Sequence, residues 1–175
     1  VPGPATWGAD VHLTGLATGP DDALYALGRR DKVGELQRRA PDGTWSLVAA
    51  GLGVKEGDVA VTPDGTVYVA EDLAARVIAV KPGAPAIVVA GAGAPAGTPA
   101  LLAPTGLHLG PGGMLYVSDR HANQVFGRAV DGAWRVVAGV MFGASCAVKW
   151  NSIYLIAAFG ILVVCWDLGA RRLAG

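Results

Sequence analysis

All four tyrosines of the chain lie in the same kind of segment, a short apolar run that follows a turn signal. These segments, at 24–27, 67–70, 115–118 and 153–156, recur at intervals of roughly 40 residues. An internal repeat of this length predicts a fold built from one supersecondary unit used several times. A single such unit cannot bury both of its faces, so neighbouring units must stack on one another.

Each repeat unit contains the signals of four short strands. The turn before the tyrosine is Pro20-Asp21-Asp22, Pro63-Asp64-Gly65, Pro111-Gly112-Gly113 or, in weaker form, Asn151-Ser152. Turn residues between two apolar runs indicate a β-hairpin. Four strands in this length are typical of a β-propeller blade. The sequence therefore predicts a single all-β propeller domain over 1–175, with about four four-stranded blades at 10–51, 58–91, 106–139 and 145–175.

The two central units resemble NHL repeats. In the third unit the end of that family's motif is matched by Asp119, Asn123, Gln124 and Val125. In the second unit it is matched by Asp72, Arg76 and Val77, with alanine in the place of the asparagine. The resemblance is good over 58–139, weaker over 10–51 and poor over 140–175. It implies a propeller, and the composition, rich in Ala, Gly and Pro, looks bacterial and actinobacterial.

The C-terminal unit has two interpretations. Residues 150–166 carry no charge and are flanked by Lys149 and Asp167. A membrane-spanning helix needs about 20 apolar residues, so a membrane-attached helix over 150–166 is one interpretation. The other, which we favour, is a degenerate fourth blade, because the segment is rich in β-branched and aromatic residues.

The closure of the ring is left open by the sequence. Four units fit the low end of the four-to-eight blades found in propellers, whereas the six-bladed rings usual for NHL-like propellers need a longer chain. The alternatives are a complete small ring, part of a larger propeller, or an array completed by a partner. An open array would expose apolar surface, and the apolar C-terminal unit is then a candidate surface for self-association.

No catalytic constellation is visible, so we predict no catalytic residue, no metal ligand and no cofactor. Cys146 and Cys165 are expected to be buried free thiols, and the three histidines lie at no metal-binding spacing. Some NHL-like propellers are metal-dependent lyases with a Pro-His-Gly motif, but Thr105 stands in the place of that histidine. A metal-dependent lyase or hydrolase with a site on the propeller axis is the alternative function.

The loops after the tyrosine strands contain a set of polar and basic residues that equivalent positions would gather on one face. The candidate binding residues are Arg29, Arg30, Arg76, Arg120, His121 and Asn123. Asp72 and Asp119, in the same loops, are expected to accept backbone N–H bonds. We therefore expect a non-catalytic binding, scaffold or sensor module with a protein or peptide partner. Nucleic acid is not expected, since the formal net charge is zero, and neither is a membrane.

Overall fold

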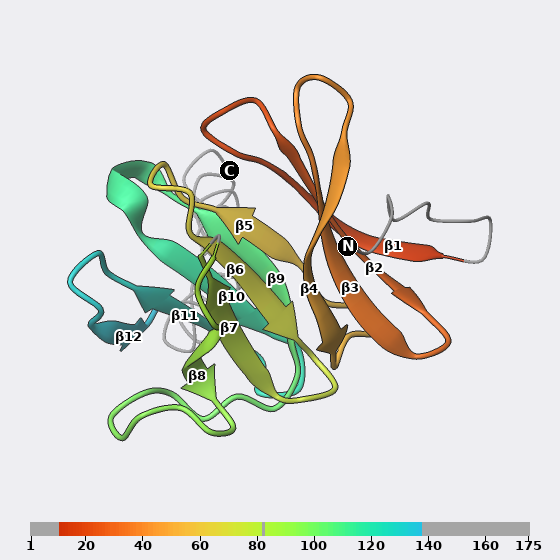
Figure 1. Cartoon of the computed structure of the whole chain (residues 1–175). Coiled ribbons are helices and arrows are strands. Elements are labelled where there is room, and N and C mark those ends of the chain that lie inside the picture. The colour runs from red at the N-terminus through yellow and green to blue at the C-terminus, as the bar shows by residue number, and fades with distance from the viewer. Residues whose placement is uncertain (1–10, 82, 138–175) are drawn as a thin grey trace, which may run out of the picture. The chain divides into compact units, whose positions relative to one another are not determined.

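The described residues form three four-stranded antiparallel sheets, which we call blades 1, 2 and 3 (Figure 1). The structure is a computed structural model that describes residues 11–81 and 83–137. Blade 1 consists of β1 (His12–Thr18), β2 (Leu24–Arg30), β3 (Val33–Arg39) and β4 (Trp45–Leu52). Blade 2 consists of β5 (Val59–Val61), β6 (Val67–Glu71), β7 (Arg76–Val80) and β8 (Ile87–Gly91). Blade 3 consists of β9 (Pro104–Leu109), β10 (Leu115–Asp119), β11 (Gln124–Arg128) and β12 (Trp134–Val136), with a short 3-10 turn, η1 (Pro111–Gly113), between β9 and β10.

The fourth predicted unit, 145–175, lies outside the described residues, as do Cys146, Cys165 and both interpretations of 150–166. The number of blades in the whole protein therefore stays a prediction. Within 11–81 and 83–137, no helix is long and apolar enough to cross a membrane.

The turns that the sequence marks are stabilised locally. In the β5–β6 turn, Asp64 accepts hydrogen bonds from the hydroxyls of Thr62 and Thr66 and, at 3.2 Å, from the Thr66 N–H. Gly65 supplies the left-handed φ of +79° that this tight turn requires. These donors stabilise the ionised carboxylate, so the pKa of Asp64 lies well below its usual value.

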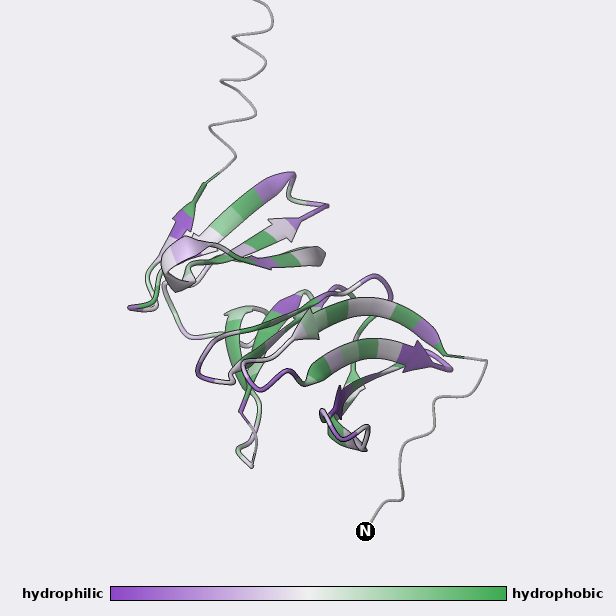
Figure 2. Cartoon of the chain, turned by 90° about the horizontal axis from the view of Figure 1, so that it is seen from above, coloured by the Kyte–Doolittle hydropathy of each residue, from purple (hydrophilic) through white to green (hydrophobic). Residues whose placement is uncertain are grey.

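Three tyrosines occupy one register position, and this defines the two faces of every blade. Tyr25, Tyr68 and Tyr116 lie on the second strand of their blades, opposite Ala17, Ala60 and His108 of the first strand. Successive side chains of a strand point to opposite faces. We call the face that carries the tyrosine the rear face, and the opposite face the front face. Figure 2 shows hydrophobic and hydrophilic residues changing along the strands.

Two hydrophobic cores join the blades. Tyr25 and Leu27 of blade 1 pack with Val67, Val69 and other residues of blade 2. The rear face of blade 2 packs against the front face of blade 3, a core formed by Ala60, Tyr68, Val77, Ala79, Leu107, Leu115, Val117, Phe126 and Trp134, among others. Blade 2 is covered on both faces, so every residue of β6 is buried. In β10 buried and half-buried residues alternate, as expected for a strand with one core face.

Candidate functional site

The six predicted binding residues lie at the end of the blades where the second strand turns into the third. Arg29 and Arg30 end β2, Arg76 begins β7, and the other three lie in the β10–β11 turn. Arg120, His121 and Asn123 are exposed, whereas Arg29, Arg30 and Arg76 are half-buried.

Arg76 has a structural role. Its Nε donates to the carboxylate of Glu71 at 2.6 Å, and the Glu71 side chain has no exposed surface. Glu71 also accepts the Gly53 N–H at 2.7 Å. The pair raises the pKa of Arg76 above its usual value, chiefly through the hydrogen bond to Glu71. Arg76 thus neutralises a buried carboxylate that ties the second strand to the β4–β5 connector.

The expected loop-capping role of the two aspartates is confirmed. Asp119 is buried and accepts N–H bonds from Leu102 at 2.7 Å and Ala103 at 3.1 Å, and from His121 and Ala122 of its own turn. Asp72 accepts the N–H groups of Lys55 and Glu56 at 2.7 and 3.2 Å. These carboxylates hold the connectors and turns in place.

The strand register corrects one detail of the repeat alignment. Asp119 pairs with Gln124, and Glu71 pairs with Arg76 in the same way. Glu71, and not Asp72, is therefore the equivalent of Asp119. The alanine in the place of Asn123 is Ala75, and both have a left-handed φ of +52°. Asparagine tolerates this conformation better than alanine does.

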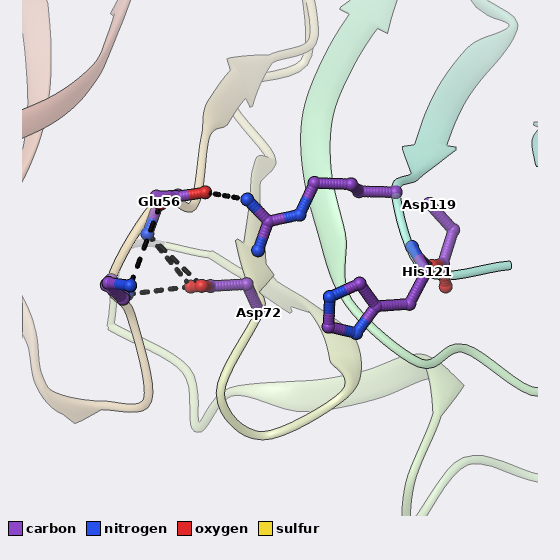
Figure 3. A network of polar contacts seen from close by, with 6 residues as sticks. Glu56, Asp72, Asp119 and His121 are labelled. Atoms are coloured by element: carbon purple, nitrogen blue, oxygen red, sulfur yellow. Dashed lines mark hydrogen bonds and ion pairs between the residues drawn. The ribbon is translucent and has the colours of Figure 1, made fainter. Parts of the chain in front are cut away.

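Arg120 reaches across a blade boundary. Its guanidinium pairs with the carboxylate of Glu56, whose backbone is held by Asp72, and Figure 3 shows these contacts meeting at Glu56. The Arg120 and Glu56 side chains are 50% and 45% exposed. An ion pair this exposed contributes little to stability. Because about half of each side chain is exposed, both charged groups are accessible to a ligand.

Two further contacts between blades were not predicted from the sequence. Asp58 precedes β5, and its Oδ2 accepts the Leu107 N–H of β9 at 3.0 Å. The Tyr68 hydroxyl accepts a hydrogen bond from Arg128 of blade 3 at 3.3 Å, and the guanidinium carbon lies 6.0 Å from the centroid of the Tyr68 ring.

An alignment of the repeats does mark Asp58 as unusual, since the equivalent positions in blades 1 and 3 are occupied by Gly15 and Gly106. A Cβ on Gly15 would lie 2.8 Å from the Asp58 carboxylate.

Grooves also lie between the blades. The innermost strands β1, β5 and β9 line a groove of about 410 Å³, in which His108 is the one titratable side chain. A second groove, of about 630 Å³, lies at the end with the β1–β2 and β5–β6 turns and is lined by the ion pairs of Arg38 with Asp21 and Lys81 with Asp64. In the described part of the chain, no three His, Cys, Asp or Glu side chains are placed to hold a metal ion.

Solved structures with a similar fold include propeller-like proteins named as lyases. Virginiamycin B lyase from Staphylococcus aureus has a TM-score of 0.55 at 16% identity, over 74% of this chain and 42% of that chain. A catalytically inactive variant of the same enzyme with quinupristin gives 0.56 at 16% identity, over 73% and 41%. A streptogramin B lyase gives 0.55 at 11% identity, over 71% and 39%. At these identities the likeness establishes an all-β, propeller-like fold and nothing about activity. The chain spans about two fifths of these structures.

Curated proteins match only a short part of the chain. Polyprenol-phosphate-mannose–protein mannosyltransferase of Mycobacterium tuberculosis is 39% identical over 57 residues, which are 32% of this chain and 11% of that protein. The enzyme of the same name from Mycolicibacterium smegmatis is 41% identical over 39 residues, 22% of this chain and 8% of that protein. The matches thus cover about a tenth of these relatives. No family model matches the chain, including any model of NHL repeats.

Proposed function

We propose that the chain is a non-catalytic binding module whose NHL-like blades present the turns between second and third strands to an acidic segment of a protein or peptide. The observation that carries this proposal is a difference between the acidic and the basic side chains at this end of the blades. The carboxylates of Glu71, Asp72 and Asp119 are occupied by backbone N–H groups or by Arg76. Arg120 and His121 remain exposed.

The ion pair of Arg120 with Glu56 explains how an acidic ligand would bind. The pair is about half exposed, so a carboxylate of the ligand can take the place of Glu56 with little loss of stability. His121 and Asn123, in the same turn, add hydrogen-bond donors beside it. Such charge-assisted contacts bind carboxylates more strongly than neutral ones do.

Fluorescence anisotropy with a labelled Glu-rich peptide tests this function. We expect saturable binding that weakens as the salt concentration rises. Arg120→Ala should raise the dissociation constant roughly tenfold, because it removes about one charged contact. Lys81→Ala is the matched control, because Lys81 is an exposed, ion-paired cation at the opposite end of the blades. Binding that Lys81→Ala weakens as much as Arg120→Ala, or no binding at all, would contradict the proposal.

A second candidate is attachment to a membrane through 150–166. It is supported by the uncharged sequence of this segment and by the partial match to enzymes named for a polyprenol-phosphate sugar donor. Flotation of the full chain with phospholipid vesicles tests it. Co-flotation that resists high salt supports attachment, and recovery of the chain in the lipid-free fraction excludes it. For the other alternative, a metal-dependent lyase or hydrolase, no described cluster of side chains offers support.

A further inference from the structure

The Glu56 carboxylate lies between two cations. Its Oε2 accepts a hydrogen bond from Nη1 of Arg120, in the β10–β11 turn. Its Oε1 lies 3.8 Å from the Nζ of Lys55. All three side chains are about half exposed. The two oxygens of this carboxylate thus each face a different positive charge, as those of a bound acidic ligand would.

The backbone of Glu56 is fixed independently of its side chain. Asp72 accepts the Glu56 N–H with both carboxylate oxygens, each at 3.2 Å, and the Lys55 N–H at 2.7 Å (Figure 3). Asp72 is itself buried. Because these bonds hold the connector, the Glu56 side chain can leave Arg120 while its backbone stays in place.

Asp72 and Arg120 occupy equivalent positions of blades 2 and 3. Each directly follows the last residue of a second strand, and these last residues, Glu71 and Asp119, have the same strand register. In blade 2 this position supplies the acceptor for the Glu56 N–H, and in blade 3 it supplies the cation for the Glu56 side chain. The same position in two neighbouring blades therefore places one carboxylate.

The Glu56 carboxylate differs from the buried carboxylates at this end of the blades. Those carboxylates accept backbone N–H groups and so hold connectors and turns. Within the described residues, the side chain of Glu56 accepts no backbone N–H and contacts only Arg120 and Lys55. An ion pair between exposed side chains contributes little to stability. The main effect of this carboxylate is therefore to occupy two cations.

We propose that Glu56 is a built-in competitor of the ligand, and that Arg120 and Lys55 together bind the acidic side chain that displaces it. The ligand is the acidic segment of the proposed function, on which this inference rests. Because the site is open only while Glu56 is displaced, the internal pair lowers the apparent affinity. A single carboxylate of a ligand only replaces the charge that Glu56 already supplies. Binding therefore favours segments with several adjacent acidic residues over those with one.

Fluorescence anisotropy with the labelled Glu-rich peptide tests this competition. Glu56→Gln keeps the length of the side chain and removes its charge. It should lower the dissociation constant about fivefold, the factor by which an exposed ion pair would close the site. Lys55→Ala should raise the dissociation constant about threefold, because it removes the second cation. Asp22→Asn is the matched control, since it removes an exposed carboxylate at the opposite end of the blades, where the left-handed φ of +55° suits asparagine.

Combining Glu56→Gln with Arg120→Ala separates competition at Arg120 from a general change in charge. Competition predicts that Glu56→Gln tightens binding much less once Arg120 is absent. A gain of the same size in both backgrounds would overturn the inference. Circular dichroism establishes that each variant is folded.

The same titrations distinguish failure of this inference from failure of the proposed function. If the unmodified chain binds the peptide through Arg120 and Glu56→Gln leaves the dissociation constant unchanged, the competition is overturned and the binding function stands. If neither the unmodified chain nor the Glu56→Gln chain binds the peptide, both are overturned.

Discussion

The carboxylate of Asp58 accepts the backbone N–H of Leu107 at 3.0 Å and so joins the innermost strands of blades 2 and 3. Its second oxygen accepts the N–H of Val59 at 2.8 Å. The neighbouring position in blade 1 is Gly15, where a side chain would collide with this carboxylate. The lack of a side chain at Gly15 therefore leaves room for the Asp58 carboxylate beside β1.

Asp58→Asn should destabilise the fold by about 1–3 kcal/mol, because an amide has one acceptor oxygen where the carboxylate uses two. Urea unfolding followed by circular dichroism measures this loss. Asp31→Asn is the matched control, since Asp31 is exposed and its left-handed φ of +49° suits asparagine. Equal stability of the two variants would show that the Asp58 contact is dispensable.

Arg76→Ala should leave the Glu71 carboxylate buried without its cation. Breaking a buried ion pair costs about 3–5 kcal/mol, and we expect the lower end because Arg76 itself is 36% exposed. Thermal unfolding measures the change. Arg120→Ala is the comparison, and it should cost under about 1 kcal/mol because that pair is exposed. A similar fall in Tm for both variants would contradict the structural role of Arg76.

The pH dependence of stability should contain a contribution from Asp64. Its folded-state pKa is depressed, so the stabilisation is present above the usual value of 3.8 and is lost as the pH falls towards the folded value. The free energy of unfolding should therefore fall less steeply below about pH 5 in Asp64→Asn than in the unmodified chain. Urea titrations at a series of pH values measure the slopes. Parallel slopes would mean that the Thr62 and Thr66 donors do not stabilise the ionised form.

Gly57→Ala should destabilise the β4–β5 connector by about 3 kcal/mol, the upper range for overpacking. The added Cβ would lie 2.1 Å from the carbonyl oxygen of Ala70, which is backbone and cannot rotate away. Gly106→Ala is the milder comparison, because its Cβ would meet the Ser118 hydroxyl at 2.6 Å and a side chain can move. Chemical unfolding should rank the two variants in this order, and the reverse order would be inconsistent with this packing.

The local features of the fold could be predicted because they depend on neighbours in sequence. The Pro-Asp-Gly turn at Asp64, the tyrosine strands and the capping by Asp119 of its own turn at His121 and Ala122 all follow from short-range patterns. The pairing of Glu71 with Arg76 was missed, since it depends on the register across a turn. The contacts of Asp58 with Leu107 and of Arg128 with Tyr68 span roughly 50 to 60 residues and depend on how blades stack.

Of the six predicted site residues, the structure assigns Arg76 to a buried ion pair and leaves Arg120, His121 and Asn123 exposed in one turn. The sequence pattern could place these residues in equivalent loops. It could not show which of them pair with a buried carboxylate and which are exposed. That distinction depends on burial, which for Arg76 is decided by Glu71 on the adjacent strand. The buried carboxylate needs a cation, and this need is visible only once the sheet is formed.

The most direct test of the binding function is an NMR titration of the ¹⁵N-labelled chain with the Glu-rich peptide. The account predicts saturable shifts of the backbone amides of 120–123 and of Lys55 and Glu56, where the ligand would displace the ion pair. Amides that line the groove at the opposite end, such as those of Asp21 and Asp64, should not move. Shifts confined to that groove, or none at all in a folded chain, would contradict the proposed binding surface.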